Sequence, residues 1–190
     1  QVVDSATRSD HIAELFRFTH KTQFEEVARQ IPLRDGVIQV VKELRRRGYK
    51  VGVVSDSYFV ATEMIRRRIF ADFALAHTLM FENGICQGKL SVNPAFSHDD
   101  GCKLHPQCKS NVLRYMIEQN PQLKKSGQII VVGDNLNDLC LLQQADQGYI
   151  IEPKHPDMRQ QGLIEIKDFD ELLQLITRDT NYPEDVEHAV

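Results

Sequence analysis

The chain has 190 residues, of which 42% are hydrophobic and 26% are charged, and its formal net charge at pH 7 is −4. These values are typical of a globular protein, and the length suits one α/β domain with a small appendage. The negative charge argues against general nucleic-acid binding, and no apolar run approaches the about 20 residues of a membrane-spanning helix. The four cysteines form no dense disulfide framework, so we expect reduced thiols and a cytoplasmic protein.

Hydrophobic periodicity predicts alternating helices and strands along the chain. Apolar residues recur at helical spacing over 8–30, with a break near His20-Lys21-Thr22, which predicts two short amphipathic helices. The elements predicted after these are a helix from residue 37, a buried strand over 49–54 ended by Ser55-Asp56-Ser57, a helix over 59–70, a β-hairpin over 78–90 around Asn83-Gly84, a helix over 109–118, a buried strand over 128–132, a short helix over 139–142, a strand over 148–151 and a helix over 169–176.

This alternation predicts an α/β fold with a doubly wound parallel sheet, a small helical cap and a β-hairpin. We expect residues 1–34 to form the helical cap region and residues 35–176 to form the core, with the hairpin at 78–90. Residues 177–190 are expected to form a polar, acidic tail.

Side chains with carboxylate or amide ends follow the predicted strand at 128–132, in the run Gly133-Asp134-Asn135-Leu136-Asn137-Asp138. Open α/β sheets bind ligands at the carboxyl ends of their strands, so Asp134, Asn137 and Asp138 are candidate site residues. Hard carboxylate oxygens in such a place suit Mg²⁺ and a phosphate. The alternative is an ordinary strand–turn–helix connection in which Asn137 or Asp138 caps the helix.

Two more polar residues lie at comparable places. Ser55 follows one predicted strand, and Lys109 opens a predicted helix. A hydroxyl and an ammonium can hold a phosphate, while a carboxylate can hold the Mg²⁺ that neutralises it. Lys103 is a rival for the lysine role, but Lys109 is better placed at a helix start. Taken singly, Ser55 is also consistent with a turn hydroxyl and Lys109 with a solvated lysine.

Three segments, in order along the chain, resemble the second, third and fourth motifs of the haloacid dehalogenase (HAD) superfamily of phosphohydrolases. They are Val51-Gly52-Val53-Val54-Ser55, Lys109 and the run from Gly133 to Asp138. Three further features are similar to those of its phosphoserine-phosphatase branch. They are the hairpin, the helix start at 32–37 and the run Arg-Gly-Tyr-Lys-Val-Gly-Val-Val-Ser at 47–55. The resemblance covers roughly residues 22–176. It implies a Mg²⁺-dependent phosphomonoesterase acting on a small phosphorylated metabolite.

The resemblance also implies roles for single residues. Ser55 and Lys109 would bind the phosphoryl group, and Asn137 would contact the substrate or its phosphate. Asp134 would be a Mg²⁺ ligand, supported by Asp138 from outside the first coordination sphere or through water. Lys109 and Asp138 are therefore the expected catalytic residues within this chain.

Two features leave the substrate open between phosphoserine and phosphocholine or phosphoethanolamine. Phosphoserine phosphatases usually carry Ser-Gly-Gly where this chain has Ser55-Asp56-Ser57. A Ser-Asp start and the Cys102-x5-Cys108-Lys109 approach to the lysine are more similar to the phosphocholine/phosphoethanolamine branch.

The first motif of the superfamily, Asp-x-Asp-x-Thr, is not found. The resemblance implies that its first aspartate is the nucleophile and its second the general acid and base. Of the upstream aspartates Asp4, Asp10 and Asp35, only Asp4 follows an apolar pair, and Ala6 stands where the second aspartate belongs. A parallel sheet without this middle strand would leave backbone groups unpaired. We therefore expect the nucleophile to lie outside this chain.

Other functions stay open at this stage. A non-catalytic phosphatase-like domain of a larger protein is one alternative, and a phosphotransferase is another. The loop over 98–108 offers His98, Cys102, His105 and Cys108 as possible zinc ligands, although their spacing matches no standard zinc module and a polar loop beside an active site is the alternative. No nucleic-acid or membrane partner is expected, and the sequence does not indicate the oligomeric state.

Overall fold

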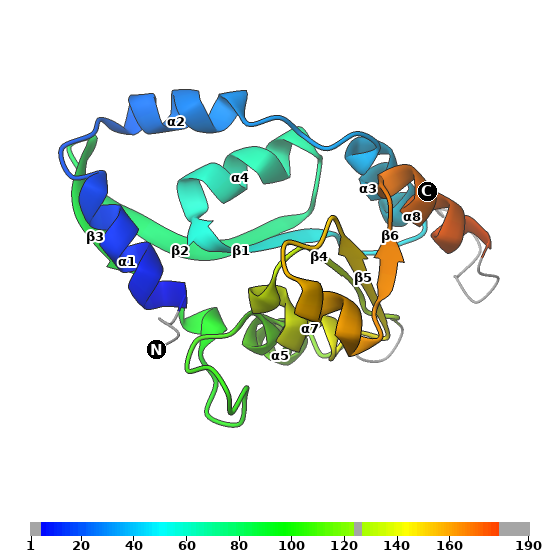
Figure 1. Cartoon of the computed structure of the whole chain (residues 1–190). Helices are drawn as coiled ribbons and strands as arrows, with labels where there is room; N and C mark the ends of the chain where they lie inside the picture. The colour runs from blue at the N-terminus through cyan, green and yellow to red at the C-terminus, as the bar shows by residue number, and fades with distance from the viewer. Residues whose placement is uncertain (1–4, 124–126, 179–190) are drawn as a thin grey trace.

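The computed structural model describes residues 5–123 and 127–178 (Figure 1). Its helices are α1 (Ser5–Leu15), α2 (Lys21–Gln30), α3 (Val37–Arg46), α4 (Phe59–Arg68), α5 (Lys109–Gln119), α7 (Leu139–Leu142) and α8 (Phe169–Arg178), with 3-10 turns η1 (Pro94–Phe96), η2 (Leu136–Asp138) and η3 (Pro156–Gln161). Its strands are β1 (Gly52–Tyr58), β2 (Phe73–Glu82), β3 (Ile85–Ser91), β4 (Ile130–Gly133), β5 (Gln147–Ile151) and β6 (Ile164–Ile166). Asp4 and most of the expected acidic tail lie outside the described residues, and α8 takes in its first two residues.

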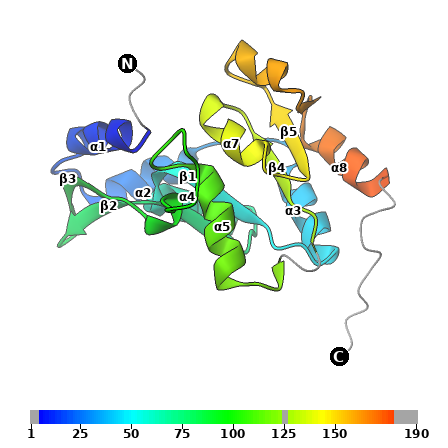
Figure 2. The same cartoon turned by 90° about the horizontal axis from the view of Figure 1, so that it is seen from below.

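The strands form two three-stranded sheets, in the orders β1-β2-β3 and β4-β5-β6. β1 pairs with β2 in parallel, and β2 and β3 form the antiparallel hairpin. β4, β5 and β6 are all parallel. The hairpin lies with α1 and α2 at one end of the molecule, and the second sheet lies with α8 at the other end (Figure 2). These parallel strands confirm the predicted α/β class.

Helices cover both faces of the second sheet, as in a doubly wound fold. Tyr149 and Ile151 of β5 pack in a cluster with residues of α3 and α8. Ile150 packs on the opposite face with Leu142 of α7 and Met158 of η3. This division follows from the period of two along a strand, which directs successive side chains to opposite faces.

The β2–β3 hairpin and the two N-terminal helices form the other end of the fold. Asn83 and Gly84 have φ values of 50° and 81°, which is the backbone that a two-residue hairpin turn of this hand requires. Phe16, Phe24 and Tyr58 pack edge to face, with ring centroids 5.2 to 5.9 Å apart. The expected helices at 8–30 are therefore present and packed, and their function as a cap stays a prediction.

The expected strand at 49–54 is wrong in its bounds. β1 begins at Gly52 and continues to Tyr58, so 55–57 lie within the strand. Val54 pairs with Leu75 and Tyr58 with His77, so four steps along β1 match only two along β2. Residues 55–57 thus bulge out of the ladder, which is why the regular apolar pattern stops at Val54. The short strand β6 and the turn η3 were not predicted.

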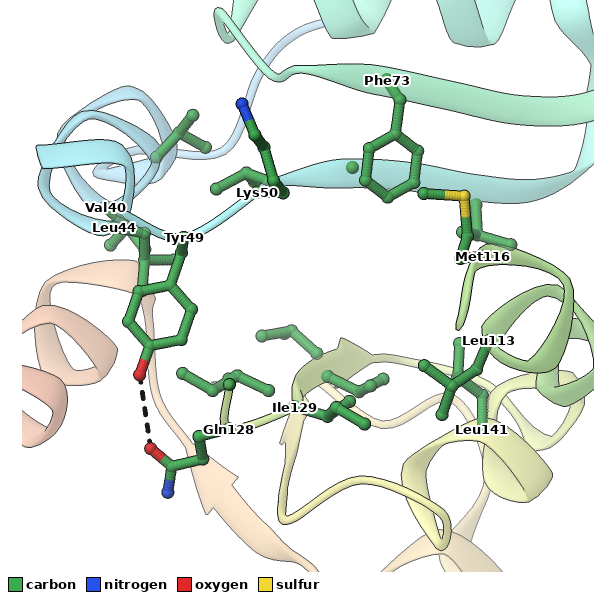
Figure 3. Close-up of a pocket in the computed structure, with 18 of the residues that line it drawn as sticks. Val40, Leu44, Tyr49, Lys50, Phe73, Leu113, Met116, Gln128, Ile129 and Leu141 are labelled. Atoms are coloured by element: carbon green, nitrogen blue, oxygen red, sulfur yellow. Dashed lines mark hydrogen bonds between the residues drawn. The ribbon is translucent and has the colours of Figure 1, made fainter. Parts of the chain in front are cut away.

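A cavity of about 550 Å³ separates the two sheets (Figure 3). β1 and β4 line it, with α3 on one side and α5 on the other. Tyr49 donates a hydrogen bond of 3.4 Å from its hydroxyl to Gln128 Oε1 at one side (Figure 3). The two strands were predicted to be buried, yet Val54 and Val132 are only half-buried, because within the described residues no strand pairs with the cavity-facing edges of β1 and β4.

Among residues 5–123 and 127–178, no helix combines the length and the apolar character needed to cross a membrane.

Candidate active site

Lys109 forms the centre of the candidate site. It is the first residue of α5, and its ammonium lies 2.7 Å from Asp138 Oδ1 and 3.8 Å from Asp56 Oδ2. The three side chains are only 10%, 13% and 14% exposed, so water screens these contacts weakly. The contacts bring together the start of α5, the bulge of β1 and the turn after β4. Lys103, the rival lysine, instead donates to the carbonyl of Asp99 and is exposed.

Asp138 is held through both of its oxygens. While Oδ1 meets Lys109, Oδ2 accepts hydrogen bonds of 3.1 Å from the backbone N–H groups of Asp134 and Asn135. Asn135 is the N-cap of η2, and Asp138 completes its capping box. Asp138 also occupies the N-cap position of α7, as one of the predicted alternatives had it, but its side chain makes no capping hydrogen bond to that helix. A Cβ atom at Gly133 would lie 2.6 Å from Asp138 Cβ, so only glycine permits this approach. The local turn therefore fixes the carboxylate that faces Lys109.

Asn137 points into the same site. Its Nδ2 donates to Asp56 Oδ2, and its Oδ1 is buried and has no hydrogen-bond partner in the described part of the chain. Leaving a buried amide oxygen unpaired costs about 1–3 kcal/mol, so such an atom is a natural contact for a ligand.

Asp134 lies in a more open position, with 30% of its side chain exposed. Its Oδ2 is 2.6 Å from Lys154 Nζ and 4.0 Å from Arg34 Nη2, and Arg34 also pairs with Glu152. The sequence did not indicate Lys154 or Arg34. Both cations are partly exposed and balance the charge of the carboxylate.

Ser55 lies in the β1 bulge beside Asp56. Its Oγ accepts a hydrogen bond of 3.1 Å from the N–H of Ser57, which leaves the hydroxyl proton available to donate. Asp56 was not predicted to be a site residue. The only sign of it was the Ser-Asp start in place of Ser-Gly.

α1 also reaches this bulge. Ser9 donates from Oγ to the carbonyl of Asp56 at 2.8 Å, and the Tyr58 hydroxyl donates to the Ser9 carbonyl at 2.8 Å. The N-terminal helix is therefore attached to the strand segment that carries Ser55 and Asp56.

The proposed zinc ligands are only partly brought together. His98 is not with the others, because its Nε2 lies 2.8 Å from Glu118 Oε1. Cys102, His105 and Cys108 do converge, and Cys140 of α7 joins them. Cys140 was not predicted, since it lies 32 positions beyond Cys108 (140 minus 108) in another element.

Comparison with known proteins identifies the family. The family model described as "Putative Phosphatase" matches residues 11–170. The chain belongs to this family. A phosphoserine phosphatase from Lactococcus lactis is 31% identical over 67% of this phosphatase-family chain and 54% of its own length. One from Wolinella succinogenes is 27% identical over 84% of the chain and 72% of the relative.

Solved structures share the fold of this phosphatase-family chain. A substrate-bound phosphoserine phosphatase complex superposes with a TM-score of 0.73 at 21% identity, over 91% of this chain and 78% of that one. A HAD family hydrolase from Salmonella enterica serovar Typhi gives a TM-score of 0.75 at 20% identity, over 94% of this chain and 57% of the hydrolase chain. Together with the family match and the phosphoserine phosphatase relatives, this makes the chain a phosphoserine-phosphatase-like member of the HAD superfamily, as its motifs predicted. It spans 54%, 31% and 35% of the lengths of the first three curated relatives that it matches.

Proposed function

We propose that the protein containing this chain is a Mg²⁺-dependent phosphomonoesterase that hydrolyses a small phosphorylated metabolite. The observation that carries the proposal is the Lys109 ammonium, held between Asp138 and Asp56 where the carboxyl ends of β1 and β4 meet. A fixed cation at this edge of the sheet is preorganised to neutralise phosphate oxygens. Membership of a phosphatase family supports the same reading.

The other residues have complementary tasks in this proposal. The Ser55 hydroxyl donates to a phosphoryl oxygen, and Asn137 contacts the substrate or its phosphate. The donor chemistry fits Mg²⁺, since Asp134 offers a partly exposed carboxylate and Asn137 a buried oxygen that has no hydrogen-bond partner among residues 5–123 and 127–178. When bound, the ion would neutralise charge on the phosphate oxygens. Asp138 takes no substrate contact and instead orients Lys109.

We assign the nucleophile to a strand that lies outside this chain and fills the cavity between β1 and β4. Three observations support this. The cavity is lined by both strands, their facing edges pair with no described strand, and Lys109 and Asp138 line the same cavity. A parallel strand there would pair the free backbone groups and end beside Lys109. A carboxylate at its end would attack phosphorus and expel the substrate oxygen, and water would then cleave the aspartyl-phosphate.

Two substrate classes remain in the proposal. The relatives named phosphoserine phosphatases favour a phosphoserine-like substrate. Asp56 favours phosphocholine or phosphoethanolamine, because a carboxylate beside the phosphate-binding lysine would attract their ammonium group and repel the carboxylate that phosphoserine also carries. Helices α1 and α2 act as a cap in this proposal, and the Ser9–Asp56 contact ties that cap to the site. All four cysteines are free, which supports a cytoplasmic protein.

The test is hydrolysis of phosphoserine, phosphocholine and phosphoethanolamine by the full-length protein, with and without Mg²⁺. We expect one class to be hydrolysed, EDTA to abolish the activity and added Mg²⁺ to restore it. Asp134→Asn should lower kcat by about 10³-fold or more, while Asp99→Asn, an exposed carboxylate outside the site, should leave it unchanged. Full activity of Asp134→Asn would contradict the metal assignment.

The same assay separates the alternatives. Transfer of phosphate to an added alcohol at the expense of hydrolysis would identify a phosphotransferase. A folded full-length protein that hydrolyses no phosphomonoester and carries no Asp-x-Asp pair would identify a non-catalytic domain.

A further inference from the structure

Four side chains that the phosphatase proposal does not use converge beside the site. They are Cys102, His105, Cys108 and Cys140, and one N or S atom from each lies within 4.8 Å of the other three. Cys102 Sγ is 3.9 Å from Cys140 Sγ, and His105 Nδ1 is 3.6 Å from each of these sulfurs. The first three come from the loop before α5, and Cys140 comes from α7, so the cluster joins two separate elements.

The separations among Cys102, His105 and Cys140 are those of ligands around a tetrahedral zinc ion, and Cys108 lies within 4.8 Å of all three. Zn–S bonds of about 2.3 Å and Zn–N bonds of about 2.0 Å place two sulfurs about 3.8 Å apart and a sulfur and a nitrogen about 3.5 Å apart. A sulfur-rich set also excludes Mg²⁺, which prefers oxygen ligands. We propose that Cys102, His105, Cys108 and Cys140 bind one structural Zn²⁺. A set of three cysteines and one histidine closes the coordination sphere and leaves no open position for catalysis.

Hydrogen bonds already hold the loop in the shape that the ion needs. The N–H of Cys102 donates to Asn111 Oδ1 at 2.8 Å, and Asn111 Nδ2 donates to the Phe96 carbonyl at 2.8 Å. The N–H of Cys108 donates to that same carbonyl at 2.9 Å. A Cβ atom at Gly101 would lie 2.2 Å from Asn111 Oδ1, so this loop requires glycine there. Asn111, which is 1% exposed, therefore fixes two of the three loop ligands from outside the coordination sphere.

The cluster is also accessible to an ion. Cys108 is buried and Cys102 and Cys140 are half-buried, while His105 is exposed and forms the outer side. The competing explanation is a disulfide between Cys102 and Cys140. Their sulfurs are 3.9 Å apart, well beyond the about 2.05 Å of an S–S bond, and a disulfide would not account for the approach of His105 to both.

The ion would connect the two elements that carry the phosphate-site pair. Cys108 directly precedes Lys109, and Cys140 follows Asp138 by two positions. Zinc would thus hold the start of α5 against the turn before α7 and keep the lysine against its carboxylate. The zinc proposal does not rest on the phosphatase proposal, because metal content is measured independently of activity.

The direct test is the zinc content of the full-length protein, purified without a metal-binding tag and passed over a chelating resin. Mass spectrometry of the dissolved metal should find about one zinc per chain. A mercurial thiol reagent should release that zinc to a chromogenic chelator. Cobalt substitution of the unmodified protein should give the intense visible absorption of tetrahedral Co²⁺ with thiolate charge transfer, which needs no variant to fold.

Variants identify the ligands. Cys140→Ser should weaken zinc binding by more than about 100-fold, since losing a ligand costs more than the about 10–100-fold of losing an outer-sphere partner. Cys86→Ala removes a thiol outside the cluster, and His98→Gln removes the histidine that contacts Glu118, so both should retain the zinc. Asp134→Asn should also retain it, which separates this site from the proposed Mg²⁺ site.

Three results would overturn the proposal. One is zinc-free full-length protein with four freely titrating thiols. Another is a Cys102–Cys140 disulfide in the purified protein. The third is zinc loss from His98→Gln as large as that from Cys140→Ser.

Discussion

Lys109 Nζ lies 2.7 Å from Asp138 Oδ1, and both side chains are nearly buried. This pair joins two elements whose ends bracket the cavity between the sheets. Because Asp138 Oδ2 is also held by two backbone N–H groups, the carboxylate cannot move away, and the ammonium is fixed with it. A phosphate-binding cation whose position is set before substrate arrives loses little entropy on binding.

Lys109→Met is expected to remove this cation and lower kcat/KM by about 10²–10³-fold, comparable to losing one preorganised electrostatic contact. It also leaves Asp138 without its ion partner, so we expect a loss of stability of about 1–3 kcal/mol, below the range for a fully buried pair. Phosphatase assays and thermal unfolding measure the two effects. Lys103→Met is the matched control, because that lysine lies outside the site; equal loss in both variants would contradict the assignment.

Asp56 is expected to affect substrate choice more than the rate with the best substrate. Asp56→Asn keeps the shape of the side chain and removes its charge beside Lys109 and Asn137. We expect kcat/KM for phosphocholine and phosphoethanolamine to fall about tenfold relative to that for a phosphomonoester without an ammonium group, since about 1.4 kcal/mol of attraction is lost. The neighbouring Ser57→Ala serves as control. An unchanged ratio of kcat/KM values would remove Asp56 from substrate recognition.

The proposed strand between β1 and β4 makes a prediction about hydrogen exchange. In a strand paired on one edge, every second amide faces the other edge and exchanges readily. If the cavity is filled by a strand in the full-length protein, the consecutive amides Val53, Val54, Val131 and Val132 should all be protected by more than about 10³-fold, as expected for core strands. Residue-resolved exchange by NMR tests this.

β5 provides the internal control for that experiment. It is paired on both sides, so Tyr149 and Ile150 should be protected whether or not the cavity is filled. Rapid exchange of alternate amides in β1 and β4, beside a protected β5, would contradict the strand assignment.

Glu43 is expected to make stability depend on pH in the acid range. Hydrogen bonds from Arg46 and then Arg47 lower the pKa of this carboxyl from 4.5 to about 2. Arg47 in turn donates to the Ile176 carbonyl, which connects α3 to α8. A lowered pKa stabilises the fold above pH about 4.5, and this contribution is lost as the pH falls toward 2.

Glu43→Gln should therefore lower the melting temperature by about 2–4 °C at pH 6, corresponding to about 1 kcal/mol for a surface pair. The difference from the unmodified protein should shrink as the pH falls from about 4.5 to 2. Melting temperatures across this range, repeated in 1 M salt to screen the pairs, provide the measurement. A difference that grows toward acid pH would contradict the sign of the shift.

Local signals in the sequence determined much of this protein. The spacing of apolar residues placed the helices, and Asn83-Gly84 fixed the hairpin turn, because both depend on neighbours within a few positions. The motif set led to the correct superfamily and to Lys109, Asn137 and Asp138, which the structure brings together. Lys109, Asp138, Asn137, Ser55 and Asp134 keep their assigned roles as predictions.

Only the tertiary structure decided the features that depend on distant contacts. Asp56 belongs to the site because Asn137, 81 positions away, donates to it, and the β1 bulge that presents it appears only in the register against β2. Cys140, and not His98, joins Cys102, His105 and Cys108 because α7 packs beside α5. β6 has three residues, too few for a periodic signal, and forms because β5 offers it an edge. Sequence patterns report local preference, whereas these contacts arise from packing between elements far apart along the chain.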